Sequence, residues 1–369
     1  MNSMEIDRRS LMLGTIALLA PASANVVAEP GLTGAAFASA AKHGDGTYVI
    51  VLLTADGRVV REIPLSARGH DIAIDTGTGR AVAFSRRPGT IAVAFDTAHV
   101  SQPQIFTAAE GRHFYGHGAF SRDGRLLYAS ENDIAGARGV IGIYDVARSY
   151  AKIGEHASFG LGPHEIILLA DGKTLAVANG GLDTVPDSGR ENLNLDAMQP
   201  SLVFVDAASG ALQAKHALSG DLKRLSLRHI AADWSGRVWF GGQWEGDPGA
   251  TPSLIGFADR DTGPKLIAPP AASSDLKGYI GSVSASADGR IIAASAPKAG
   301  RVIYIDAESG KVAAECLLKD ACGIAPDRQA DFAITSGFGD FRHDSAGAAV
   351  IAQTQLVDVA FDNHLRRVS

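Results

Sequence analysis

Short apolar runs recur along the whole chain, and polar turns such as DGR, DGK, SGR or TGR separate many neighbouring runs. The arrangement begins again at positions 70, 117 and 164, so that two successive repeats are each 47 residues long. The next repeat begins at position 229, because a polar insertion lengthens the interval. A period of about 40–50 residues with four short strands per unit is typical of a β-propeller rather than a helical solenoid.

One histidine begins the first apolar run in five of the repeats. These histidines are His70, His117, His164, His229 and His364. Two further repeats keep the pattern with Ser282 and Cys322 at the equivalent position. Four predicted third strands end in an aspartate before a turn, at Asp96, Asp145, Asp206 and Asp306. The seven phases predict an all-β protein, a seven-bladed β-propeller.

The last apolar strand, which carries His364, is expected to close the ring against the N-terminal strands near residues 31–41. Closure of this kind leaves no long sheet edge exposed. The repeat fills nearly everything after residue 30, so we predict a single domain over residues 29–369. The 42 glycines and the apolar content of 46% agree with a turn-rich fold that buries a core. The net charge of −6 argues against nucleic acid or an anionic membrane surface as a partner.

Residues 1–28 have the order of an export signal. Two arginines, Arg8 and Arg9, precede a short apolar run and then small residues up to Ala24 or Ala28. The paired arginines suggest the twin-arginine route, and the alternative is a general secretory signal with two adjacent basic residues. Either route predicts a periplasmic protein. The apolar run is too short for a stable membrane span, so we expect no transmembrane segment in the mature protein.

The chain has two cysteines, Cys316 and Cys322, six positions apart. In an oxidising compartment this spacing predicts a disulfide that joins the last strand of one blade to the first strand of the next. The alternative is that Cys322, at the histidine phase, faces the central channel as a soft metal ligand. One sulfur cannot serve both roles.

The five histidines are expected to converge, because the first strand of every propeller blade lines the central channel. Neutral imidazoles there offer lone pairs to one cation, whereas protonated imidazoles would repel one another. Nitrogen ligands suit iron, copper, zinc or nickel better than calcium or magnesium. We therefore predict bound iron or copper, with zinc as a further choice, and an affinity that falls as the pH drops through about 6.5. The alternative is that each histidine is a hydrogen-bonded blade residue that tethers its loop.

Other polar and aromatic residues are candidates for the channel or its mouth. Arg112, His113 and Tyr115 precede His117, and strand alternation would place His113 and Tyr115 on the channel side with His117. Two residues of loops that enter or leave the fifth and sixth repeats are expected at the mouth, namely Gln243 and Tyr279.

The residues that follow two of the ring histidines, Asp71 and Glu165, are expected to contact the blades, because neighbours on a strand point to opposite faces. Glu165 is also kept as a candidate to support a ring histidine or to stand at the channel mouth. The insertion over residues 179–200 is expected either to pack on one face or to cover the channel. In the second case Arg190 could bind an anion and Met198 a soft metal.

Several blocks of the sequence are long enough to compare with known families. They are GRHFYGHGAFS at 111–121, SENDIAGARGVIGIYD at 130–145, GPHE at 162–165, DSGRENLNLDAMQPSL at 187–202 and FDNHL at 361–365. These blocks resemble those of the exported bacterial propellers of domain-of-unknown-function family 1513, over roughly residues 33–366. Val185 stands where a histidine is expected before the proline of the insertion, which argues against a metal role for that loop.

The resemblance implies a role in metal acquisition at the cell envelope. Members of the family tend to accompany imelysin-like lipoproteins and haem-containing oxidoreductase-like proteins in iron-responsive gene clusters, so proteins of these two kinds are expected partners. The ring is also similar in arrangement to the copper-binding hub of nitrous oxide reductases. This chain, however, has no cupredoxin domain and has five ring histidines rather than seven.

The leading hypothesis is a periplasmic metal-binding propeller that is accessory to iron or copper acquisition or to an envelope redox system. One alternative is a metal-dependent oxidoreductase that uses the same ring, with Tyr115 and His113 nearest for proton transfer. Another is a protein-interaction scaffold in which the histidines are structural. The sequence has no nucleophilic triad, phosphate-binding glycine loop or CxxCH haem motif, so it names no reaction.

Overall fold

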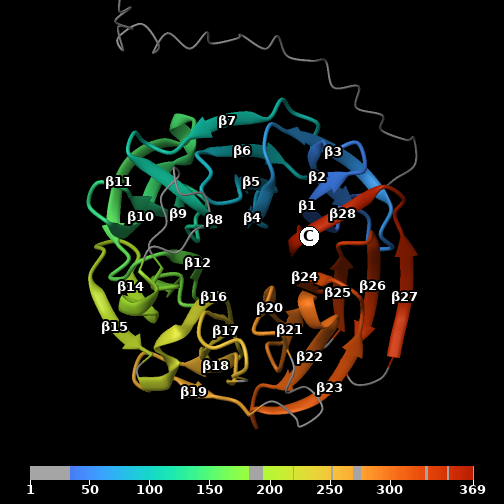
Figure 1. The fold of residues 1–369 in the computed structure, drawn as a ribbon. Helices are drawn as coiled ribbons and strands as arrows, with labels where there is room; N and C mark the ends of the chain where they lie inside the picture. The colour runs from blue at the N-terminus through green and yellow to red at the C-terminus, as the bar shows by residue number, and fades with distance from the viewer. Residues whose placement is uncertain are drawn as a thin grey trace, which may run out of the picture.

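The computed structural model describes residues 34–182, 194–218, 220–250, 252–268, 276–328, 331–346 and 349–368. Within these ranges the chain forms seven four-stranded antiparallel sheets around a central axis (Figure 1). The predicted all-β, seven-bladed propeller is confirmed. No helix in the described ranges is long and apolar enough to cross a membrane. The predicted export signal lies outside the described residues and stays a prediction.

Each blade runs from an inner strand at the axis to an outer strand at the rim. With the inner strand first, the blades are β28 (Val359–Arg367), β1 (Phe37–His43), β2 (Tyr48–Leu53) and β3 (Val59–Leu65); β4 (Gly69–Asp75), β5 (Arg80–Ser85), β6 (Ile91–Asp96) and β7 (Gln104–Thr107); β8 (Arg112–Phe120), β9 (Leu126–Asp133), β10 (Arg138–Asp145) and β11 (Ala151–Ala157); β12 (Pro163–Leu168), β13 (Thr174–Asn179), β14 (Ser201–Asp206) and β15 (Leu212–Ala217); β16 (Leu225–Ala232), β17 (Val238–Trp244), β18 (Ile255–Ala258) and β19 (Lys265–Leu266); β20 (Ser282–Ala285), β21 (Ile291–Ala296), β22 (Arg301–Asp306) and β23 (Lys311–Leu317); and β24 (Ala321–Pro326), β25 (Asp331–Ser336), β26 (Asp340–Ser345) and β27 (Ala349–Gln355). Short 3-10 helices are η1 (Val146–Arg148), η3 (Leu195–Ala197), η4 (Gly220–Arg224) and η6 (Pro297–Ala299).

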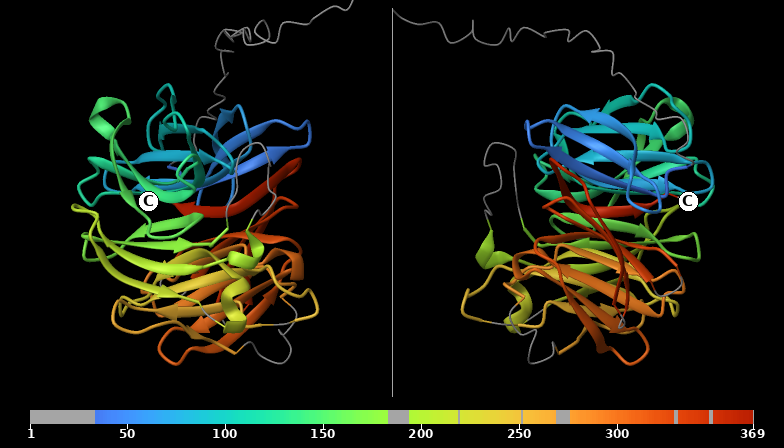
Figure 2. Two further views of the ribbon diagram at one scale, coloured as in Figure 1. Left: turned by 60° about the vertical axis from the view of Figure 1, so that its left-hand side comes forward. Right: turned by 90° about the vertical axis from the view of Figure 1, so that its right-hand side faces the viewer.

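The first blade combines both ends of the described chain. Its inner strand β28 pairs antiparallel with β1, from Phe37 opposite Arg367 to His43 opposite Val359. Figure 2 shows β28, in red, between the blue strands of the first blade and the orange strands of the seventh. The predicted closure of the ring by the C-terminal strand is therefore confirmed.

The core lies between neighbouring blades, because each blade is covered on both faces. In β13 all six residues are buried. Trp239 of β17 is fully buried in an apolar cluster that includes Phe204 of the preceding blade and Ile303 of the following one. Residues of outer strands such as β15 remain largely exposed. This packing holds the inner strands rigidly around the axis.

Six of the seven inner strands have an irregular register near the position predicted for the histidine ring. The shifts fall at residues 69–72 in β4, 114–118 in β8, 163–165 in β12, 227–229 in β16, 321–324 in β24 and 361–365 in β28. The strand β20, which carries Ser282, pairs with β21 in regular register. A β-bulge places an extra residue in one strand and re-aims the side chains around it. Strict alternation therefore fails at this level of the channel.

Candidate metal centre

The five predicted ring histidines meet at the axis of the propeller. The ring centroids of His70 and His117 lie 4.8 Å apart, and those of His117 and His164 lie 4.7 Å apart. The centroids of His164 and His229 are separated by 4.9 Å. His364 of the closing strand lies 4.8 Å from His70, His117 and His229 alike. These five buried side chains form one cluster, hereafter the histidine ring.

Gly116, within the bulge of β8, allows this close packing. Its φ of 103° lies in a region that favours glycine. A Cβ at this position would come within 2.6 Å of Cδ2 of His70. Any other residue would therefore push His70 away from its neighbours.

Three carboxylates form hydrogen bonds with the Nδ1 atoms of ring histidines. Nδ1 of His117 lies 2.8 Å from Oδ2 of Asp71. His70 is bonded in the same way to Asp362, and His229 to Glu165, each over 3.3 Å. Ionised carboxylates only accept hydrogen bonds, so in these pairs Nδ1 carries the proton and Nε2 keeps its lone pair. Carboxylates behind histidines are the usual way in which proteins orient metal ligands.

The expectation that Asp71 and Glu165 turn away from the ring is wrong. Each directly follows a ring histidine, yet each contacts the ring, because the bulges in β4 and β12 break the alternation of side chains. Each carboxylate contacts the ring histidine of the next blade along the chain rather than the histidine that directly precedes it in the sequence. Asp71 binds His117, and Glu165 binds His229.

Arginines on both sides of the ring neutralise these carboxylates. Arg366 donates to Asp71 over 2.6 and 2.7 Å and to Glu165 over 2.7 Å. Asp362 accepts from Arg68 over 2.6 Å and from Arg86 over 3.2 Å. Burial alone would raise the pKa of these acids, but the cationic neighbours outweigh it. The pKa of Glu165 falls to about 2, and those of Asp71 and Asp362 also lie below the usual range.

Burial keeps four of the ring histidines neutral. It lowers the pKa of His70 to about 3, although the hydrogen bond that His70 donates to Asp362 acts in the opposite direction. Burial also lowers the pKa values of His164, His229 and His364, and nearby histidines add to the effect. Neutral imidazoles present lone pairs, which is the state that a metal requires.

Two sets of three histidines have ligand atoms close enough to share one ion. They are His70, His117 and His364, and His117, His164 and His229, with ligand atoms within 4.8 Å of one another in each set. Three buried nitrogens in these sets have no hydrogen-bond partner, namely Nε2 of His117, Nε2 of His364 and Nδ1 of His164. Unpaired buried nitrogens are costly in the absence of a ligand. The donor set therefore fits a transition metal ion.

Asp71, His117 and Glu165 also have ligand atoms within 4.8 Å of one another. This third set does not suit a cation, because Arg366 already binds both carboxylates and would repel a metal beside them. The all-nitrogen sets are the better candidates. Two nitrogens on one ion lie at most about 4.2 Å apart at ordinary bond lengths, and the ligand atoms of each all-nitrogen set lie within 4.8 Å of one another.

A cavity of about 20 Å³ opens beside the ring. Its lining residues are His70, His164, His229, Arg86, Arg87, Arg228, Gln243, Tyr279 and Asn363. Gln243 and Tyr279, which the sequence analysis placed at the channel mouth, form a backbone bridge with one another. Nδ2 of Asn363 donates to the hydroxyl oxygen of Tyr279 over 2.7 Å. The three arginines and Asn363 were missed by sequence reasoning. Arg228 and Asn363 each directly precede a ring histidine, which is the signal that could have found them.

The predicted disulfide between Cys316 and Cys322 is wrong, since both thiols are free. Cys316 lies on the outer strand β23, and Cys322 lies on the inner strand β24 of the next blade. The last strand of one blade and the first strand of the next lie at opposite ends of the radius of a propeller. Sγ of Cys322 contacts the carbonyl oxygens of Asp320 and Phe361 over 3.3 and 3.6 Å. Cys322 is not part of the ligand sets found among the described residues.

The other candidates have different surroundings. Arg112 points outward across its blade and binds Asp133 over 2.7 Å and Glu155 over 3.2 Å. His113 and Tyr115 are fully buried and contact each other, with centroids 4.9 Å apart. The bulge after Phe114 removes the alternation argument that placed them beside the ring. Met198 is buried at the end of η3, and Arg190 lies outside the described residues.

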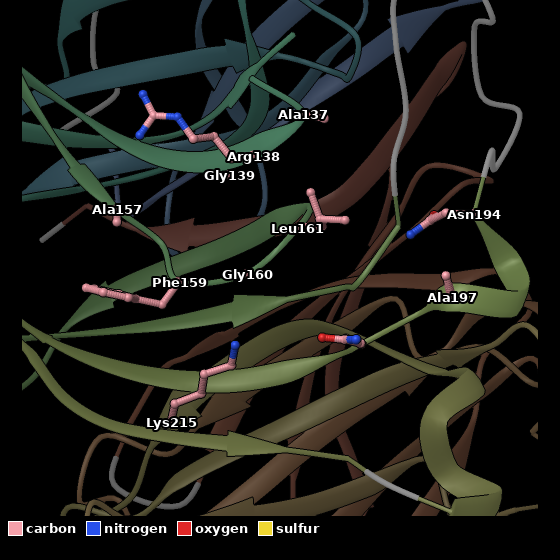
Figure 3. Close-up of a pocket in the computed structure, with 11 residues that line it drawn as sticks. Ala137, Arg138, Gly139, Ala157, Phe159, Gly160, Leu161, Asn194, Ala197 and Lys215 are labelled. Atoms are coloured by element: carbon pink, nitrogen blue, oxygen red, sulfur yellow. The ribbon is translucent and has the colours of Figure 1, made fainter. Parts of the chain in front are cut away.

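A larger cavity of about 500 Å³ lies between the third and fourth blades (Figure 3). The turn that carries Phe159, Gly160 and Leu161 forms one side, and Asn194 and Ala197 lie on another. None of the ring histidines lines it. This cavity is therefore separate from the candidate metal centre.

Comparisons with known proteins agree with this architecture. The chain is similar to the structure of the Kuenenia stuttgartiensis hydrazine synthase, with a TM-score of 0.58 and 14% identity over 85% of this chain and 90% of that chain. A likeness at this identity concerns the fold alone. No curated protein sequence matches the chain. The family model described as "Protein of unknown function (DUF1513)" matches residues 63–368, which is most of the chain. The chain therefore belongs to the DUF1513 family.

Proposed function

We propose that this protein binds one transition metal ion, iron or copper, in the histidine ring and serves a metal-acquisition or redox system of the cell envelope. The observation that carries the proposal is the set of buried, unpaired ring nitrogens on His117, His164 and His364. A purely structural histidine would bond both nitrogens to the blades or to water. Here carboxylates accept from Nδ1 of His70, His117 and His229, and the ligand atoms of each set of three histidines lie within 4.8 Å of one another.

The ring supports one ion rather than two. His117 belongs to both sets of three histidines. Its Nδ1 atom is bonded to Asp71, so only Nε2 can reach a metal. A single lone pair serves one ion at a time. His117 is therefore the central ligand, and the remaining histidines complete its coordination from either side.

The choice of iron or copper follows from the ligand atoms. Imidazole nitrogen binds copper, iron, zinc and nickel well, whereas calcium and magnesium prefer oxygen. The carboxylates beside the ring are occupied by arginines. When bound, the ion would supply Lewis acidity or electron transfer, and the chain's own part is to orient the imidazoles and to keep them neutral.

The cellular setting of the proposal comes from the sequence. The signal-like segment of residues 1–28 supports export to the periplasm. The family resemblance supports imelysin-like lipoproteins and haem-containing oxidoreductase-like proteins as partners. The closed propeller would act as the metal-binding component among them.

A metal-dependent oxidoreductase is a second candidate function. The cavity beside His70, His164 and His229 favours it, because a metal with an open neighbouring position is typical of catalytic rather than structural sites. The polar residues of this cavity, rather than Tyr115 or His113, are then the groups placed to contact a substrate.

Metal content tests the proposal. Protein exported to and purified from a periplasm should contain about one iron or copper per chain by elemental analysis. In titration calorimetry of the metal-free protein with copper(II), iron(II) and zinc(II), His117→Ala should abolish tight binding, since it removes the nitrogen common to both sets. His364→Gln should weaken binding with less loss of packing.

His216→Ala is the matched control. His216 lies on the outer strand β15, and its Nε2 is 2.7 Å from the carbonyl oxygen of Asp259. This variant should bind metal as the wild type does. Equal binding by the wild type, His117→Ala and His364→Gln would contradict the proposal and favour a scaffold whose histidines are structural.

A further inference from the structure

The two sides of the histidine ring differ in charge. On one side, next to the residues that follow the histidines, Asp71 and Glu165 share the single cation Arg366, so this side keeps a net negative charge. On the side of the residues that precede them, the cavity is lined by three arginines, two amides and a phenol: Arg86, Arg87, Arg228, Gln243, Asn363 and Tyr279.

No carboxylate lines this cavity. Two of its arginines have acidic neighbours: Arg86 binds Asp362, which also binds Arg68 and His70, and Arg228 lies 3.8 Å from Glu245. The guanidiniums of Arg68, Arg86, Arg87 and Arg228 outnumber these two carboxylates, so the potential around the cavity is positive, and low-dielectric walls strengthen it. The cavity therefore attracts anions and disfavours cations other than one held by the ring nitrogens.

The cavity also offers hydrogen-bond donors. Tyr279 accepts from Nδ2 of Asn363, so its own hydroxyl proton remains to donate to a third group. Lys298 lies 5.0 Å from the centroid of the Tyr279 ring and adds positive charge behind it. These donors and cations line the same cavity as His164, whose Nδ1 has no hydrogen-bond partner.

We infer that this cavity binds a small inorganic anion as an additional ligand of the metal in the ring. The inference rests on the proposed metal site and names the class of ligand or substrate that this site takes. A volume of about 20 Å³ is little more than one water molecule needs, so the cavity suits a small inorganic anion better than an organic acid or a peptide. The arginines attract the negative charge, and the hydroxyl of Tyr279 and the side-chain amides orient the bound anion by donating hydrogen bonds to it.

Azide binding to the copper(II)-loaded protein tests the inference, because azide is a small linear anion whose coordination to copper(II) gives a charge-transfer absorption. Arg87→Gln and Arg228→Gln should each weaken azide binding by about fivefold or more, through loss of one nearby positive charge. Lys215→Gln is the control, since Lys215 is an exposed cation on the outer strand β15. It should leave azide binding unchanged. Copper content and thermal unfolding, measured on each variant, identify any that misfolds.

Nitric oxide binding to the iron(II)-loaded protein shows whether a variant loses azide because of its lost charge or because its metal site is distorted. Nitric oxide is a neutral diatomic ligand, so only a distorted site should weaken its binding. Its affinity should be the same in the wild type and in Arg87→Gln. Equal azide affinity in Arg87→Gln, Arg228→Gln and Lys215→Gln, with copper bound in all three, would overturn the anion site and leave the metal site standing. Equal loss of azide and nitric oxide would overturn it too. A wild type that takes up no metal would overturn both proposals.

Discussion

Arg366 donates to Asp71 through two nitrogens, with Nε 2.7 Å from Oδ1 and Nη2 2.6 Å from Oδ2. Arg366 belongs to the closing strand β28, and Asp71 belongs to β4 of the next blade. Asp71 in turn accepts from Nδ1 of His117. The strand that closes the propeller therefore also orients the central histidine of the candidate metal centre.

Arg366→Gln should destabilise the protein and weaken metal binding together. Asp71 and Glu165 would keep their charges in a buried position without a cation, which costs roughly 3 kcal/mol of unfolding free energy. Urea unfolding monitored by circular dichroism measures this change. Arg367→Gln is the control, because Arg367 is exposed and its contacts with the carbonyl and the carboxylate of Asp327 are at the surface, so its loss should cost less than about 1 kcal/mol. Similar costs for both variants would show that the arginine bridge is unimportant.

The two sets of three histidines predict graded effects on metal affinity. His70→Ala and His164→Ala each remove one set and leave the other, so each should weaken binding only partly. The double variant removes both sets without touching His117, and it should bind as poorly as His117→Ala does. Titration calorimetry with copper(II) compares them. If His117→Ala loses no more affinity than His70→Ala, His117 is not the shared ligand.

Acid should lower the stability of the metal-free protein. Unfolded histidines take up protons below about pH 6.5, whereas folded His70, with its pKa near 3, does not. The unfolded state then binds more protons, so the unfolding free energy falls as the pH drops from about 6.5 towards 3, by about 1.4 kcal/mol per pH unit for each such histidine. Chemical unfolding at several pH values measures the slope. His70→Gln should make it shallower, and an unchanged slope would mean that His70 titrates normally when folded.

Burial of the ring histidines also changes the pH dependence that the sequence predicts for metal binding. The sequence alone predicts that affinity falls through about pH 6.5, as for exposed imidazoles. Because the pKa values of His70, His164, His229 and His364 are lowered, protons compete with the metal at these nitrogens only at lower pH. We therefore expect protonation of these four histidines to cost little metal affinity between about pH 7.5 and 6. A steep loss across this range would place the bound metal on exposed histidines instead.

Both thiols should be free and slow to react. Burial raises the pKa of Cys316 to about 12 and that of Cys322 well above its usual value, so very little reactive thiolate forms. Labelling in denaturant without a reductant should reveal two thiols per chain, and labelling of the native protein should be slow. A reductant should leave the melting temperature unchanged. A mass consistent with one internal disulfide in the exported protein would contradict this expectation.

Much of the architecture could be predicted because it repeats. Each blade uses the same succession of apolar runs and turns, so the phase of His70, His117 and His164 marks equivalent inner strands. Position in the repeat then implies position around the axis, and five histidines at one phase must converge. The same reasoning failed for Cys316 and Cys322. These two residues are close in the sequence, but one lies on an outer strand and the other on an inner strand of the propeller.

The sequence by itself determined the seven-bladed propeller, its closure by the last strand and the gathering of the histidines, because these depend on a local pattern repeated around a ring. Only the tertiary structure decided how the ring is held and what it faces. The bulges turn Asp71 and Glu165 inward against strand alternation. Arg366 reaches Asp71 from the far end of the chain, and Arg86, Arg228 and Asn363 meet at one cavity from three different blades. Such contacts join residues that are far apart in the chain and occupy different positions in their repeats. They leave no repeating pattern in the sequence, so only the folded structure shows them.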